Sequence, residues 1–253
     1  MSVAERSAGE KAKQGGIGET IKVVIQALLI ALVFRTFLYH PFNIPSGSME
    51  PTLLIGDYLF VSKFSYGYSR YSFPLDLSFV DGRIWEGLPE RGDIAVFRPP
   101  REPDTDYIKR VIGLPGDRIQ MREGALYIND QAVTREPAGM WEGEGRFGGE
   151  AAIRQYHETL PNGVSYLTLD MTENGAGDNT RVFEVPPDHY FLMGDNRDNS
   201  QDSRFPQGTV GFVPAENLVG RAEIIFFSVE DSPAWAFWNW PKSLRFDRLF
   251  DTL

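Results

Sequence analysis

The chain has 253 residues, of which 25 are basic and 35 acidic, so its formal net charge is −10. This acidic balance excludes a protein that binds nucleic acid through a basic face, and the absence of cysteine excludes disulfides, thiolate nucleophiles, iron–sulfur clusters and cysteine-based zinc sites. The 25 glycines and 17 prolines, with 42% hydrophobic residues, favour a folded chain with many turns and short strands.

The first predicted element is an apolar segment near the N-terminus. Its uninterrupted core, residues 23–34, is shorter than the ~20 residues that a spanning helix needs. Residues 37–39 extend it to an aromatic edge, and the long side chain of Arg35 near its end can reach the membrane interface. Because no small-residue cleavage site follows, we interpret 21–39 as an uncleaved transmembrane anchor rather than a cleaved signal peptide.

Charge is distributed unevenly about this anchor. Residues 1–40 carry five basic and three acidic residues, a net charge of +2, which leaves −12 for the rest of the chain. Lys11, Lys13 and Lys22 precede the apolar core. By the positive-inside rule, this predicts a cytoplasmic N-terminal segment over 1–20 and an extracytoplasmic domain over 40–253.

After the anchor, the sequence becomes a series of short β-type runs separated by glycine and proline turns. Residues 125–133 indicate a hairpin that turns at Asn129 and Asp130. Runs rich in β-branched and aromatic residues predict strands at 56–64, 93–98, 107–114, 189–194 and 222–229. We therefore expect a mainly β fold.

Two stretches interrupt this strand pattern. Between about 135 and 181 the composition shifts to Gly, Glu, Asn and Thr, which is more typical of an inserted, loop-rich lobe than of the central sheet. A second insertion is expected from 66 to 91.

The C-terminal stretch from 232 to 250 is both aromatic and basic. This composition suits a membrane interface and, equally, an aromatic strap packed on the sheet. Pro241 argues against a single continuous amphipathic helix. The residues concerned are Trp235, Phe237, Trp238, Trp240, Lys242, Arg245 and Arg248.

Three segments carry unusual polar residues. Residues 43–57, NIPSGSMEPTLLIGD, hold Ser-Gly-Ser between two prolines, a stiffened turn that can expose a hydroxyl, although such a tripeptide alone is usually only a loop. Residues 106–117, DYIKRVIGLPGD, place Lys109 in an apolar strand-like run, whereas a strand lysine normally faces solvent. Residues 194–204, GDNRDNSQDSR, predict a dense hydrogen-bond network. The competing interpretation, a calcium loop, lacks the glycine and terminal glutamate of an EF-hand.

A serine nucleophile needs an adjacent base. His40 adjoins the anchor, His157 lies in the glycine-rich lobe and His189 begins a strand, and none has obvious supporting groups. A G-x-S-x-G elbow is also absent. Because burial among apolar neighbours lowers the pKa of a lysine, Lys109 can take the place of histidine, and a Ser-Lys dyad is chemically sufficient without metal or cofactor.

The three segments, in this order behind an N-terminal anchor, resemble the motif boxes of bacterial type I signal peptidase, the membrane-bound leader peptidase. The resemblance implies that Ser48 is the nucleophile and Lys109 the general base. It also implies that the Ser46 hydroxyl joins the Ser48 backbone N–H in the oxyanion hole. Ser200 would orient the lysine, with the Asp202 and Arg204 ion pair in support. Shallow apolar subsites for small substrate side chains are implied at Phe42, Ile44, Met49, Leu53, Tyr107 and Ile108.

The fold implied by the resemblance is a β catalytic core with an inserted β-rich lobe, preceded by one transmembrane helix. The core would comprise about 40–64, 92–117 and 186–230, the lobe about 118–185, and a Trp-rich tail 231–253. The implied function is a serine endopeptidase that cleaves signal peptides from exported preproteins at the outer face of the bacterial cytoplasmic membrane. Its expected partners are signal peptides, bound as an added strand, and membrane lipid, with a monomeric enzyme and no metal.

Two other functions remain open from the sequence. A membrane-anchored module that holds extended peptides without cutting them would need the groove, but not Ser48 and Lys109 together. A Ser-Lys self-cleaving regulator is disfavoured because the anchor places the domain outside the cytoplasm. The chain also departs from many Gram-negative relatives in having one candidate span instead of two, and the disulfide of some relatives cannot form without cysteine.

Overall fold

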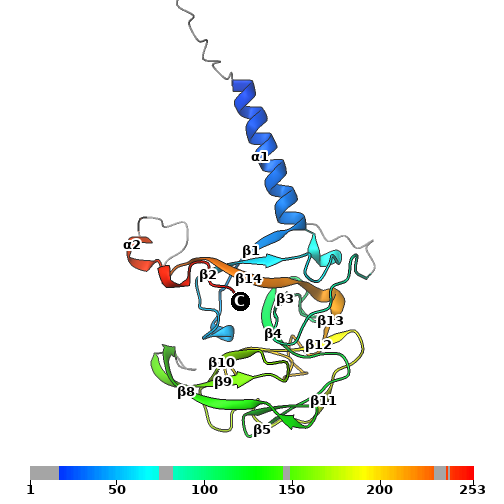
Figure 1. Cartoon of the computed structure of the whole chain (residues 1–253), viewed down its shortest axis with the longest axis vertical. Helices are drawn as coiled ribbons and strands as arrows, with labels where there is room; N and C mark the ends of the chain where they lie inside the picture. The colour runs from blue at the N-terminus through cyan, green and yellow to red at the C-terminus, as the bar shows by residue number, and fades with distance from the viewer. Residues whose placement is uncertain (1–16, 74–81, 145–148, 231–237, 239) are drawn as a thin grey trace, which may run out of the picture.

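The computed structural model describes residues 17–73, 82–144, 149–230, 238 and 240–253 (Figure 1). An apolar helix, α1 (Ile17–Phe37), leads into a mainly β protein, as the sequence predicts. Its stretch Gly18–Phe37 is long and apolar enough to cross a membrane, and none of it is buried in the protein. The exact boundaries of the anchor and of the segments on either side of it stay predictions.

A central antiparallel sheet follows the helix. All five strands expected from β-type composition are confirmed, as β2, β3, β4, β12 and β14. The sheet has seven strands in the order β1-β2-β14-β3-β4-β12-β13. Their bounds are β1 Tyr39–Asn43, β2 Asp57–Ser62, β3 Ile94–Phe97, β4 Tyr107–Gly113, β12 His189–Met193, β13 Val213–Pro214 and β14 Leu218–Ser228.

A lobe of two smaller sheets lies on the side of the central sheet away from α1 (Figure 1). The predicted hairpin is confirmed there: Asn129 and Asp130 have φ of 54° and 65°, the left-handed conformation of such a turn. One sheet has the order β11-β5-β6-β7 and the other β10-β9-β8. Their strands are β5 Arg118–Arg122, β6 Ala125–Ile128, β7 Gln131–Ala132, β8 Thr134–Glu144, β9 Glu150–Thr159, β10 Ser165–Asp170 and β11 Phe183–Glu184.

The expectation of a loop-rich stretch between about 135 and 181 is wrong. Strands β8 and β9 pair antiparallel along nearly their whole length, and β10 extends the sheet. A bulge between Pro137 and Gly139, where Gly139 has a φ of 104°, lets β8 continue past the proline. Pairing between strands, as between Trp141 and Ile153, therefore stabilises β8 and β9 despite their glycine and glutamate content.

The described part of the C-terminal stretch packs along β14. The Trp240 ring lies 4.9 Å from the Phe227 ring, and the Phe250 backbone N–H donates to Ile225. Helix α2 (Trp240–Ser243) spans only four residues, as Pro241 predicts. Trp235 and Phe237 lie outside the described residues.

Candidate active site

Ser48 lies on a one-turn helix, η1 (Gly47–Met49), in the connection between β1 and β2. Met49 and Leu53 are fully buried in the core beneath the central sheet, and they hold this turn against it. Ser48 itself is only 7% exposed. The burial of Met49 and Leu53, which follow Ser48 in sequence, therefore fixes the position of its backbone.

Lys109 lies on β4 and points toward this turn. Its Nζ donates to Ser48 Oγ at 2.6 Å and to the Ile108 carbonyl at 2.9 Å. Burial lowers the pKa of Lys109 to about 8, against the opposing effect of the Asp202 and Asp195 carboxylates. The register of β3 and β4, which pairs Ala95 with Lys109, directs the amine to the Ser48 side of the strand.

Asp202 and Arg204 form a buried ion pair beside the lysine. Arg204 Nε and Nη2 donate to the two carboxylate oxygens of Asp202 at 3.0 and 2.9 Å. Burial alone would raise the pKa of Asp202, but the Arg204 cation and its hydrogen bonds outweigh burial and lower that pKa. The carboxylate therefore stays ionised near Lys109.

The other two predicted serines lie differently. Ser200 Oγ is buried near Asp202, and among the described residues it makes no hydrogen bond to Lys109. Ser46 immediately precedes η1 in extended conformation, and its side chain is exposed and does not cap the turn. Its hydroxyl therefore lies on the solvent side of the same turn as Ser48.

The six residues expected to line subsites divide into two groups. Ile44, Met49, Leu53 and Ile108 are buried in one hydrophobic core, against which Phe42 packs. Tyr107 belongs to a different cluster, and its ring centroid lies 5.7 Å from Lys109 Nζ.

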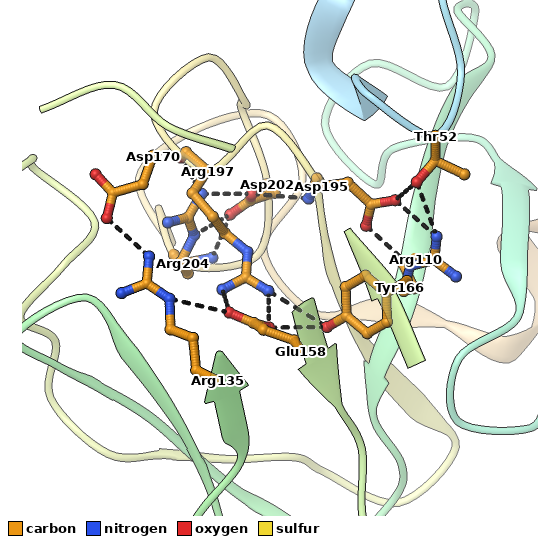
Figure 2. A network of polar contacts seen from close by, with 11 residues as sticks. Thr52, Arg110, Arg135, Glu158, Tyr166, Asp170, Asp195, Arg197, Asp202 and Arg204 are labelled. Atoms are coloured by element: carbon orange, nitrogen blue, oxygen red, sulfur yellow. Dashed lines mark hydrogen bonds and ion pairs between the residues drawn. The ribbon is translucent and has the colours of Figure 1, made fainter. Parts of the chain in front are cut away.

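Sequence reasoning missed the residues that hold the 194–204 loop against the Ser48 turn. Arg110 Nε and Nη2 donate to the Asp195 carboxylate at 2.8 and 2.6 Å, and Thr52 Oγ1 donates to it at 2.6 Å (Figure 2). Asn196 donates from its backbone to Ser48 O at 3.2 Å and from Nδ2 to Gly47 O at 3.0 Å. The dense network predicted for this loop is present. Its partners on other segments, however, could not be identified from the sequence.

Sequence reasoning also did not single out Gly194, whose role is steric. A Cβ added there would overlap both Ser200 and the Ser48 carbonyl oxygen. The backbone of the loop therefore approaches the Ser48 turn as closely as it does because this residue has no side chain.

The aspartates of this loop are occupied by protein partners, which argues against the calcium interpretation. Asp195 binds Arg110, Asp202 binds Arg204, and Asp198 accepts from the backbone of Met171 and Thr172. Within the described part of the chain, no group of three or more His, Asp or Glu residues could hold a metal ion.

Comparison with known proteins gives consistent matches. A family model described as signal peptidase, peptidase S26, matches residues 17–227. The chain is 41% identical over 252 residues to a signal peptidase I of Rickettsia typhi, covering 89% of this chain and 90% of that protein. It is 40% identical to a signal peptidase I of Rickettsia prowazekii, with the same coverage. A crystal structure of a signal peptidase I from Enterococcus faecalis is 27% identical, over 53% of this chain and 96% of that chain, with a TM-score of 0.30.

Proposed function

This chain belongs to the signal peptidase I family, peptidase S26, and we propose that it cleaves signal peptides with Ser48 as nucleophile and Lys109 as general base. The observation that carries the assignment is the 2.6 Å contact between Lys109 Nζ and Ser48 Oγ inside a buried site. A serine hydroxyl and a lysine with lowered pKa, held at this distance, supply a nucleophile and its base without further groups.

The first chemical step is acylation of the enzyme. Neutral Lys109 removes the proton of Ser48 as the serine oxygen attacks the scissile carbonyl carbon. The protonated Lys109 then gives this proton to the leaving amine, which departs as the new N-terminus of the mature protein. With a pKa of about 8, the amine is poised for both transfers near neutral pH.

Deacylation reverses these roles. Lys109, neutral again, removes a proton from water as the water oxygen attacks the ester carbonyl of Ser48. The protonated amine returns the proton to Ser48 Oγ and so releases the signal peptide. The Asp202–Arg204 pair supports the lysine in both steps through the fixed negative charge of its buried carboxylate.

The oxyanion of each tetrahedral intermediate would be held by the Ser46 hydroxyl and the Ser48 backbone N–H. The Ser48 N–H is fixed within the η1 turn, and Ser46 directly precedes that turn with an exposed side chain that can rotate toward the oxyanion when substrate binds. One such donor typically contributes ~3 kcal/mol to lowering the barrier. Ser200, buried beside Asp202, is proposed to orient the lysine when the site is occupied.

The substrate would bind as an added strand beside the Ser48 turn, with its side chains directed into shallow apolar subsites. Ile44, Met49, Leu53 and Ile108 belong to one buried core cluster, and they are proposed as the apolar floor of subsites that accept small side chains. Phe42 and Tyr107 are proposed as the remaining walls.

The enzyme is proposed to act at the outer face of the bacterial cytoplasmic membrane, where signal peptides emerge. Helix α1 suits a single-pass anchor, and the lysines before it favour a cytoplasmic N-terminus. The expected partners are preprotein signal peptides and membrane lipid, with a monomeric enzyme.

The test is cleavage of a purified preprotein by wild type, Ser48→Ala and Lys109→Met. We expect each variant to lose measurable cleavage while its melting temperature shows that it is folded. Ser165→Ala, on an exposed position of the lobe, is the matched control and should cleave like wild type. Cleavage by either folded dyad variant would refute the Ser-Lys mechanism.

A further inference from the structure

The inserted lobe reaches the 194–204 loop through a buried ion pair between Glu158 on β9 and Arg197 (Figure 2). Arg197 Nη1 donates to Glu158 Oε1 at 2.7 Å, and Nη2 donates to Oε2. The Glu158 side chain is completely inaccessible to solvent, and that of Arg197 is nearly so. The pair is therefore a fixed, bidentate connection between two parts of the chain that are distant in sequence.

Three consecutive residues of the loop bind three different parts of the protein. Asp195 binds Arg110 and Thr52, Asn196 binds the Ser48 turn, and Arg197 binds Glu158. The backbone of Leu169, at the end of β10, donates to Asp195 O and accepts from Arg197 N, at 2.9 Å each. The lobe thus holds both ends of a three-residue segment whose middle residue holds the serine.

Tyr166 on β10 contacts both Glu158 and Arg110. Its hydroxyl donates to Glu158 Oε2 at 3.1 Å, and the Arg110 guanidinium lies 4.1 Å from the centre of its ring. Arg110 is the neighbour of Lys109 in β4. One residue of the lobe therefore contacts both the partner of Arg197 and the strand that carries the proposed base.

The cost of burying these charges points to a role in geometry. Removing two ions from water costs about as much as their attraction returns, so well-packed apolar residues would stabilise the fold equally well. Unlike apolar packing, a bidentate ion pair fixes both the distance and the orientation of the loop relative to the lobe.

We propose that Glu158 is a positioning residue, which fixes segment 195–197 through Arg197 and so holds Ser48 in the geometry of attack. This role rests on the proposed function of Ser48. The inserted lobe then takes part in positioning the nucleophile, although none of its described residues has a hydrogen bond to Ser48 Oγ or Lys109 Nζ.

The test compares Glu158→Gln with wild type in cleavage of a preprotein by the full chain in lipid vesicles. We expect kcat to fall about 30-fold with little change in KM, because a small displacement of reacting groups costs turnover more than binding. Glu173→Gln is the matched control, since it makes the same change in the same lobe, in an exposed pair with Arg154. This control should cleave like wild type.

A second readout separates positioning from a loss of folded protein. A peptide aldehyde with a small terminal side chain adds Ser48 Oγ to its carbonyl carbon, and the Ser48 proton goes to the resulting oxyanion. The matching peptide alcohol binds without forming a bond. We expect Glu158→Gln to lose aldehyde affinity in parallel with kcat and to keep alcohol affinity. Wild-type turnover per folded molecule, or equal loss of both affinities, would overturn the proposal.

Tyr166→Phe keeps the proposal testable if Glu158→Gln does not fold. It retains the ring beside Arg110 and removes only the hydroxyl, which donates to Glu158 Oε2 and accepts from Arg197 Nη2, so we expect kcat to fall about 5-fold with the same aldehyde signature. Wild-type kcat in this variant would overturn the positioning role. Ser48→Ala runs beside it: cleavage there refutes the proposed function itself, whereas an inactive Ser48→Ala with a fully active Glu158→Gln refutes only the inference.

Discussion

Among the described residues, two lysines in different regions are buried, and their comparison separates a lowered pKa from a chemical role. Lys63 follows β2 and Lys109 lies in β4, and each is only 4% exposed. Burial lowers the pKa of both to about 8. Lys109 faces the hydroxyl of Ser48, whereas Lys63 Nζ donates to the backbone carbonyl of Ser72.

The surrounding charges differ as well. Asp202 and Asp195 act on Lys109 and raise its pKa against burial. Arg35 and Arg98 act on Lys63 in the same direction as burial, and only Asp106 opposes them. A lysine with a pKa of about 8 therefore occurs in two places, and the hydroxyl partner of Lys109 distinguishes the proposed base from a structural lysine.

The largest expected difference between the two lysines is in catalysis. Lys109→Met should reduce kcat/KM about 10⁴-fold or more, because the serine loses its base. Lys63→Met removes an equally buried amine and should leave kcat/KM unchanged. Steady-state cleavage of a preprotein by both variants checks this, and a comparable loss in the two would make burial, rather than contact with Ser48, the relevant property.

Gly194→Ala tests the close approach around Lys109 without changing any titratable group. The added Cβ would push the loop from the Ser48 turn, and we expect kcat to fall about 100-fold. The measurement is kcat per folded molecule, with folding followed by circular dichroism. A variant as active as wild type would mean that the serine turn tolerates displacement.

The pH dependence of kcat/KM sharpens the comparison further. Activity should rise with pH with a midpoint near 8, as Lys109 loses its proton. Asp202→Asn removes a carboxylate that raises the pKa of Lys109, so the midpoint should move to lower pH by about 1 unit. A midpoint that stays fixed or moves to higher pH would show that another group is being titrated.

The smallest expected effect is on stability, and it concerns Lys63. Its pKa is lower in the folded protein than in the unfolded chain, so between about pH 8 and 10.5 the unfolded chain binds more protons. Wild type should therefore gain about 2 kcal/mol of stability relative to Lys63→Met as pH rises from 7 to 10.5, less than the ~3 kcal/mol of the full pKa shift because water partly screens the amine. Unfolding in urea at several pH values measures this difference, which would be absent if Lys63 were solvated.

Sequence composition predicted the strands well because their residues are buried on both faces or pack on neighbouring strands. It also indicated Lys109, since Ile108 and Val111 beside it are apolar. Lys63 lies in a similar setting between Val61 and Phe64, so apolar neighbours alone do not distinguish the two lysines. The contact with Ser48, 61 positions away, does.

The resemblance implied a β-rich lobe, which is confirmed, but the composition of the lobe did not indicate its strands. Its strands are stabilised by pairing between β8, β9 and β10, which local composition does not record. Glu158 and Arg197 are 39 positions apart, and the residues around each of them do not indicate that it is buried. A buried charge becomes recognisable only when its partner is known, so the network around the 194–204 loop could be expected but not assigned.

The pairing of β4 has one more consequence. Ala95 lies opposite Lys109 and Ile94 opposite Arg110, and successive side chains of a strand point to opposite faces. A shift of one residue would present the guanidinium of Arg110 to Ser48 and turn the amine away. Arginine does not give up its proton at physiological pH, so such a protein would fold with Ser48 separated from its proposed base. The same amino-acid sequence would therefore bring Ser48 and Lys109 together in one strand register and separate them in the next.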